Sequence, residues 1–174
     1  IEDIVALVAL YRPGPMENIP AYCEVKNGQR SLQSIHPLID HILEETQGII
    51  VYQEQVMQIA QLMGGYSLGG ADLLRRAMGK KIKEAMDAER PKFESGAAKK
   101  GVDKQKAKEV FDLLEKFANY GFNKSHAAAY AVVSYQTAWL KANYPVEFMA
   151  AVMNCDLHLT EKLNVYKQEI ERLG

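Results

Sequence analysis

Apolar side chains recur every three or four positions along most of the chain, which is the spacing of one face of an α-helix. This pattern predicts helices over residues 4–10, 36–45, 53–63, 71–79, 81–100, 103–119, 124–143, 145–153 and 160–173, and a short helix that ends near Asn27-Gly28. We therefore expect a mainly α fold, built as a single helical domain of roughly eight to ten helices.

Residues 48–52, with the sequence Gly-Ile-Ile-Val-Tyr, depart from the helical pattern because they are few and mostly β-branched. They predict a lone strand or a buried extended segment, so the fold has at most one short strand near 49–52. Arg12-Pro13-Gly14-Pro15 ends the first helix, since both prolines lack a donor and fix φ. Asp103 is expected to cap the helix that follows it. Pro91 is expected to kink or break the helix over 81–100.

The composition is that of a globular protein, with 48% hydrophobic and 25% charged residues in a chain of 174. No apolar run approaches the ~18 residues of a membrane helix. No signal peptide precedes the first helix, and the chain begins at Ile1 rather than Met, so we expect a cytoplasmic piece of a longer protein. Cys23 and Cys155 are expected to be reduced thiols, and the four histidines show no metal-binding spacing.

The net charge of −1 conceals an uneven distribution. Residues 1–70 hold three basic and eight acidic side chains, residues 71–108 hold twelve basic and six acidic, and residues 109–174 hold six basic and eight acidic. One short stretch therefore carries the positive potential, as expected of a protein that offers one face to phosphates. A solvated, lysine-rich pair of helices would produce the same run.

The basic stretch opens with Arg75, Arg76 and Lys80. Arg76 and Lys80 are four residues apart and share a helix face, while Arg75 lies about 100° around the axis from Arg76. Like charges at this spacing repel unless an anion relieves them, and an arginine fork fits the oxygens of a triphosphate. The alternative is a solvated basic helix end that complements the helix dipole.

A second candidate is the turn that leads into the helix over 124–143. Asn123 or Ser125 can cap this helix, and Lys124 adds charge where backbone N–H groups already favour anions. His126 and Tyr130 share a face with three alanines between them. An imidazole and an aromatic ring over small side chains suit a base and a sugar. Helix–helix packing through the alanines is the alternative.

A third candidate is the polar start of the helix over 53–63, Tyr52-Gln53-Glu54-Gln55. We interpret it as a buried hydrogen-bond network that positions neighbouring elements, and a catalytic Glu54 is the less favoured reading. The chain has no P-loop, GxSxG or Rossmann GxGxxG motif, and no close pair of aspartates suited to two catalytic metals. It therefore has groups for holding phosphates and no evident catalytic apparatus.

Taken together, the motifs closely resemble the bacterial DNA polymerase III alpha subunit, a family C polymerase. The resemblance is weakest over 17–45 and 82–108. It is carried by residues 9–16 (ALYRPGPM), 48–57 (GIIVYQEQVM), 69–81 (GGADLLRRAMGKK), 117–126 (FANYGFNKSH), 129–137 (AYAVVSYQT) and 144–151 (YPVEFMAA).

The resemblance implies that residues 1–174 are a fingers domain, with residues 1–16 as a possible connection to the palm. It implies that Arg75 and Arg76 contact the triphosphate of an incoming deoxynucleoside triphosphate, with Lys80 a weaker candidate. The turn Asn123-Lys124-Ser125 would lie beside the nucleotide and His126 would sense the sugar. Tyr130 would pack against the nucleotide or the template base.

The same resemblance places the catalytic aspartates and their Mg²⁺ in a palm that this chain lacks. The isolated fragment is therefore expected to catalyse nothing and to hold no cofactor of its own. Its implied partners are the deoxynucleoside triphosphate, primer–template DNA, the palm of the same polypeptide and, through regions not present here, other replicase subunits; a membrane is not among them.

Two other functions stay open from the sequence. One is a helical interaction module whose basic stretch binds the backbone of DNA or RNA. Salt-dependent binding of nucleic acid without any nucleotide preference would favour this function. The other is a small self-sufficient enzyme acting on nucleotides, which the lack of paired carboxylates disfavours.

Overall fold

The computed structural model describes residues 1–80, 83–118 and 120–173. Within these residues the chain forms ten α-helices, two 3₁₀ helices and no β-strand, which confirms the mainly α expectation. The chain divides into two compact units, Ile1–Tyr130 and Ala131–Gly174, which are described separately. The assignment of all 174 residues to a fingers domain stays a prediction at this point.

The first unit opens with α1 (Glu2–Leu10), the 3₁₀ helix η1 (Pro15–Asn18) and α2 (Ile19–Lys26), in agreement with the expected stop at Pro13 and Pro15. The expected helix over 36–45 was too long: α3 spans only Asp40–Leu43, and the 3₁₀ helix η2 (Glu44–Thr46) follows it. The reason is local. Pro37 disfavours helical geometry at His36, and the Asp40 carboxylate accepts bonds from the backbone N–H groups of Ile35 and His36, both at 2.9 Å.

Four longer helices follow in the first unit: α4 (Gln53–Leu62), α5 (Leu68–Gly79), α6 (Lys83–Lys99) and α7 (Lys104–Ala118). The Ser67 side chain caps α5 by accepting from Gly70 N–H, and the Asp103 carboxylate caps α7 as expected. Pro91 lies inside α6 and does not end it. Lys81, the expected start of the sixth helix, and Asn119, the expected end of the seventh, lie outside the described residues.

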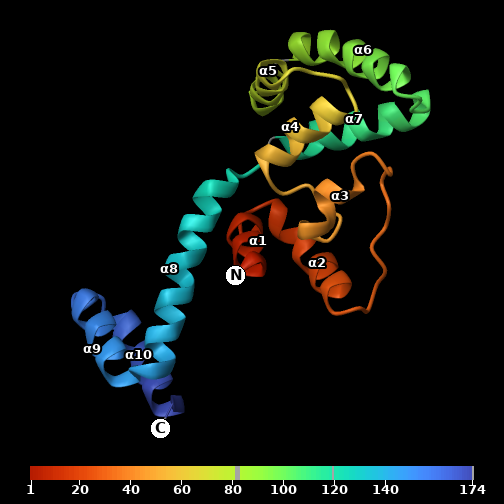
Figure 1. Ribbon diagram of the computed structural model, residues 1–174. Coiled ribbons are helices and arrows are strands. Elements are labelled where there is room, and N and C mark those ends of the chain that lie inside the picture. The colour runs from red at the N-terminus through yellow and green to blue at the C-terminus, as the bar shows by residue number, and fades with distance from the viewer. Residues whose placement is uncertain (81–82, 119, 174) are drawn as a thin grey trace. The chain divides into compact units, whose positions relative to one another are not determined.

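The core of the first unit lies between these helices. In Figure 1, α6 and α7 run side by side as a hairpin, and α4 lies against α7. Phe93 of α6 and Phe111 of α7 are fully buried, with ring centroids 5.4 Å apart. Leu74 of α5 and Ile59 of α4 are buried in the same cluster. The apolar faces predicted from the sequence therefore meet in one core, and this core holds α4 and α5 in fixed relation.

The β-branched segment before α4 forms no strand, in keeping with the expectation of at most one. Ile50, Val51 and Tyr52 are buried, and Tyr52 makes a single parallel bridge with Phe122. This bridge joins the entry of α4 to the turn that precedes α8 (Lys124–Asn143). The helix α8 continues from the first unit into the second.

The second unit contains the later part of α8, α9 (Pro145–Cys155) and α10 (Thr160–Leu173). Lys141 of α8 pairs with Glu169 of α10 at 2.5 Å. Bonds from Arg172 and Lys141 lower the pKa of Glu169 to about 2. An apolar cavity of about 300 Å³ lies between α9 and α10, lined by residues that include Met149, Met153 and Ile170.

Candidate functional site

Gln53, the first residue of α4, joins three segments that are far apart in the sequence. Its backbone N–H donates to Phe122 O at 2.9 Å, and Phe122 N–H donates to Val51 O at 3.0 Å. Its side-chain amide donates to Gly121 O at 3.1 Å and accepts from Arg75 Nη1 at 3.2 Å. The turn before α8 and the basic residues of α5 therefore meet at the start of α4.

The arginine pair of α5 is organised by Asp72, one turn earlier in the same helix. Arg75 contacts Asp72 Oδ1 at 2.7 Å, and Arg76 Nε contacts Asp72 Oδ2 at 2.9 Å. The two arginines differ in access, since the Arg75 side chain is 22% exposed and the Arg76 side chain 63%. Lys80, the C-cap residue of α5, is also exposed. Arg76 and Lys80 thus face solvent, while Arg75 points inward to Gln53.

The hydrogen bonds to Asp72 lower the pKa of its carboxyl group. The bonds and charges of Arg75, and more weakly of Arg76, hold the pKa of this carboxyl group below its usual value of 3.8. Asp72 therefore stays ionised at neutral pH and fixes the orientation of both guanidinium groups.

At the start of α8, a second carboxylate satisfies backbone and side-chain donors. Glu54 accepts from Lys124 N–H at 3.1 Å and from Asn123 Nδ2 at 3.1 Å. Asn123 Oδ1 accepts from His126 N–H at 2.8 Å and so caps the helix, as the sequence suggested. The Lys124 ammonium pairs with Glu45 at 2.6 Å. In this structure Glu54 takes the place that an anion would take at the helix N-terminus.

A row of rings follows on from this turn. The His126 ring lies 5.4 Å from that of Phe122 and 4.7 Å from that of Tyr130, centroid to centroid. His126 and Ser125 are exposed, and Tyr130 is 55% exposed. The imidazole is thus held between two aromatic side chains with one face of the row open to solvent, which is a geometry that can receive a flat or sugar-like group.

Arg12 holds the same turn from the other side, a role that the sequence did not reveal. Its Nη2 donates to Tyr120 O at 2.5 Å and its Nε to Ala9 O at 2.9 Å. The guanidinium carbon lies 4.6 Å from the centre of the Phe122 ring. Burial lowers the pKa of Arg12, although the group stays cationic. The Arg-Pro-Gly-Pro segment therefore ends α1 and, through Arg12, also holds the turn before α8 in place.

Several basic residues beyond Lys80 are engaged within the protein. Arg90 pairs with Asp112 and Glu115 of α7 at 2.6 and 2.8 Å. The Lys100 ammonium donates to the backbone carbonyl of Leu62 at 2.5 Å, and Lys106 pairs with Glu109 at 3.2 Å. These contacts favour a pair of helices stabilised by internal contacts. They disfavour a continuous face that binds phosphates.

The core network predicted at the start of α4 is confirmed. Gln55 is 1% exposed, and its carbonyl oxygen accepts from the backbone N–H groups of Val51 and Tyr52 at 2.8 and 2.9 Å. Its amide nitrogen donates to Ile42 O at 3.1 Å and Thr46 Oγ1 at 2.8 Å. Burial, with the nearby charges of Glu45 and Glu54, raises the pKa of Tyr52, so its hydroxyl stays protonated.

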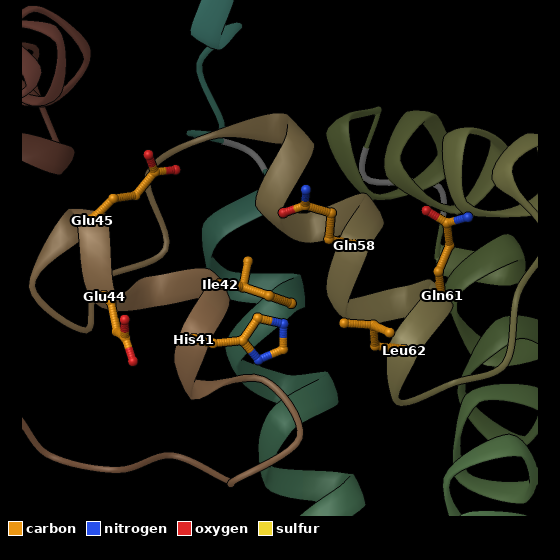
Figure 2. Close-up of a pocket in the computed structure, with 7 residues that line it drawn as sticks. All are labelled: His41, Ile42, Glu44, Glu45, Gln58, Gln61 and Leu62. Atoms are coloured by element: carbon orange, nitrogen blue, oxygen red, sulfur yellow. The ribbon is translucent and has the colours of Figure 1, made fainter.

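A cavity of about 580 Å³ lies beside this network, on the α3 side of α4. Figure 2 shows the His41 ring directed toward Leu62, with Glu45 at one end. Glu44 and Glu45 border it, and two carboxylates make it unsuited to a polyphosphate.

Across residues 1–80, 83–118 and 120–173, no group of three His, Cys, Asp or Glu side chains is placed to hold a metal ion. None of the described helices is both long and apolar enough to span a membrane.

Side-chain contacts link Arg75 and Arg76 to the turn before α8, while Lys80 and Ser125 take no part in these contacts. A continuous chain of contacts runs from Arg76 through Asp72, Arg75 and Gln53 to Gly121, two residues before the Asn123 cap. The sequence did not reveal Gln53 as the link, the double pairing of Asp72 or the contacts of Arg12 with the turn. Of these three features, only the pairing of Asp72 could have been predicted from the sequence. An acidic residue three and four positions before two arginines predicts ion pairs within a helix.

Comparison with known proteins gives a consistent result. Residues 1–101 match the family described as the bacterial DNA polymerase III alpha subunit finger domain. The chain is 59% identical over its full length to the DNA polymerase III subunit alpha of Caulobacter vibrioides, and 59% identical over 99% of its length to that of Neisseria meningitidis. It is 53% identical over its full length to that of Rickettsia prowazekii. In each case it spans about 15% of the relative's length.

Proposed function

Since this chain belongs to the bacterial DNA polymerase III alpha subunit finger domain family, we propose that it binds the incoming deoxynucleoside triphosphate and the templating region during DNA-templated DNA synthesis. The observation that carries the proposal is the chain of contacts from Arg76 to Gly121, which ties the cationic end of α5 to the start of α8. Phosphate-binding and sugar-binding groups on different helices are useful to one ligand only if their separation is fixed.

The proposed roles follow from access and charge. Arg76 and Lys80 are exposed on α5 and receive the triphosphate, together with Arg75. The turn residues Asn123, Lys124 and Ser125 lie beside the nucleotide. For Arg75, Asn123 and Lys124, contact with the ligand requires an exchange of their present partners Asp72, Glu54 and Glu45.

His126 and Tyr130 take the other end of the nucleotide. The open face of the ring row gives the imidazole access to a sugar, and a ring at 4.7 Å from the imidazole restricts its position. A fixed group at the sugar can discriminate against an additional hydroxyl, and Tyr130 packs against the nucleotide or the template base.

The chemistry itself belongs to the longer protein. In the proposed reaction a primer 3′-hydroxyl attacks the α-phosphorus and pyrophosphate leaves; Mg²⁺ held by palm aspartates supplies the metal-ion catalysis. This chain contributes positioning and charge neutralisation, which dominate phosphoryl transfer. The isolated 174 residues therefore synthesise no DNA. The partners of the domain are the primer–template DNA and the palm of the same cytoplasmic polypeptide.

The proposal is tested by Arg76→Ala in the full-length alpha subunit. Loss of a charged contact to the triphosphate should lower kcat/KM for nucleotide by an amount equivalent to at least ~1.5 kcal/mol. Arg172→Ala is the matched control, because Arg172 is 69% exposed and paired with a carboxylate one turn away, as Arg76 is. Equal kcat/KM values in the parent and Arg76→Ala enzymes would refute the role of Arg76.

The role of His126 is tested separately by His126→Ala, with the exposed His158→Ala as control. The frequency of ribonucleotide incorporation relative to deoxynucleotide should rise in the first variant and stay unchanged in the second. If the ratio is the same in both, His126 does not sense the sugar.

A further inference from the structure

The side chain of Gln53 makes two bonds whose direction is fixed by chemistry. Arg75 can only donate and the Gly121 carbonyl can only accept, so the amide must present its oxygen to the first and its nitrogen to the second. The stem of the side chain is also close to the turn, since a Cβ at Gly121 would lie 3.1 Å from Gln53 Cγ. Gln53 therefore contacts both sides of the candidate site with defined polarity.

The contact with Arg75 differs in kind from the Asp72 contact. Asp72 lies on the same helix as Arg75, so their ion pair fixes the guanidinium group relative to α5 alone. The bond to Gln53 crosses from α5 to α4, and Gln53 in turn is bonded through its backbone N–H to Phe122, whose ring packs on His126. A displacement of Gln53 would change the relation between the Arg75 guanidinium and the His126 imidazole.

We propose that Gln53 is a positioning residue that sets the separation between the phosphate-binding arginine of α5 and the sugar-sensing histidine of α8, and thereby governs selection of deoxyribose over ribose. The inference rests on the proposed function of these two residues. Gln53 itself touches neither phosphate nor sugar. Of its two neighbours in sequence, Tyr52 is buried and Glu54 bonds the start of α8.

The chemistry of the amide allows its two bonds to be separated by substitution in the full-length alpha subunit. Gln53→Met keeps the length of the side chain and removes both bonds. Gln53→Glu keeps an acceptor for Arg75 but places a carboxylate against the Gly121 carbonyl. Gln58→Met is the matched control, because Gln58 is an exposed glutamine on the same helix.

Steady-state KM and kcat for deoxynucleotide, and the ratio of deoxynucleotide to ribonucleotide incorporation, distinguish the variants. Gln53→Met should raise KM about tenfold, the scale of a hydrogen bond to a charged group, and should lower the selectivity ratio. Gln53→Glu should keep KM within about threefold of the parent while the selectivity ratio still falls. Gln58→Met should change neither. A residue needed only for folding would lower the active fraction, and so the apparent kcat, and leave the ratio intact; that result would overturn the proposal.

A double substitution supplies the decisive comparison. If Gln53 acts through Arg75, then Gln53→Met should raise KM little further in an enzyme that already carries Arg75→Met. Multiplication of the two separate effects would overturn the proposal. An unchanged KM in Arg75→Met alone would instead remove the proposed function of Arg75. A raised KM in Arg75→Met with parental values in both Gln53 variants would remove only the inference about Gln53.

Discussion

Gly96 of α6 lies close against the backbone of Gly64, which follows α4. A Cβ added to Gly96 would lie 1.8 Å from Gly64 O and 2.6 Å from Gly64 C. Real contacts of this kind require at least 3.0 Å, so α6 or the α4 end would have to move by roughly 1 Å or more. The obstacle is a carbonyl group, which cannot rotate away as a long side chain could. Gly96→Ala therefore disturbs the packing of α6 on the core.

The expected free-energy change has two terms of opposite sign. Overpacking in a well-packed interior costs about 1–3 kcal/mol, and an obstacle made of backbone places this site at the upper end. Alanine gains about 1 kcal/mol over glycine in a helix interior. The steric term is larger, so Gly96→Ala should lower the free energy of unfolding by about 2 kcal/mol or more.

Urea unfolding of the 174-residue chain, followed by far-UV circular dichroism, measures this change. Gly69→Ala is the control, because Gly69 lies in α5 with nothing within 4 Å of an added Cβ. It should be neutral or stabilising by about 0.5 kcal/mol. A Gly96→Ala chain as stable as its parent would refute the close approach of α6 to Gly64.

Two further predictions concern the elements that hold the site. Gln55→Leu leaves the buried N–H groups of Val51 and Tyr52 without their acceptor and should lower the free energy of unfolding by roughly 3 kcal/mol. The same urea titration measures this change, with the exposed Gln58→Leu as control. A smaller loss of stability in Gln55→Leu than in Gln58→Leu would contradict the hydrogen-bond network of Gln55. Because the folded-state pKa of Asp72 is depressed, its stabilising contribution is present above pH 3.8 and is lost as pH falls through the lower folded value. The difference in thermal stability between the parent and Asp72→Asn should therefore narrow below about pH 4, and a difference that stays constant to pH 2 would count against the arginine pairing.

The sequence predicts helices well where local signals agree. The bounds of α8 and α10 are those expected from periodicity, and Asp103 caps α7 as anticipated. The helix over 36–45 was overextended because Pro37 can occupy either a first helical turn or a non-helical turn, and the choice depends on the bonds that Asp40 makes. Periodicity alone cannot resolve such a competition.

The candidate site was predicted in its members but not in its connections. Arg75 and the 123–126 turn were identified from charge, spacing and the family resemblance. The bond from Gln53 to Gly121 joins residues 68 positions apart, and that of Arg12 to Tyr120 joins residues 108 apart. Such pairings depend on how the helices pack, and a single sequence carries no periodic signal for them.

Because Arg75, Arg76, Asn123 and Lys124 already have acceptors in the protein, a nucleotide would contact these four residues by exchange of partners. The ease of exchange differs between residues. The Arg76–Asp72 pair is largely exposed, and ion pairs of this kind are weak because water and salt screen them. Arg75 is less exposed and is held by both Asp72 and Gln53, so its release costs more. On the proposed function, Arg76 and Lys80 would therefore meet the triphosphate first, while Arg75 keeps its bond to Gln53 and maintains the spacing to His126.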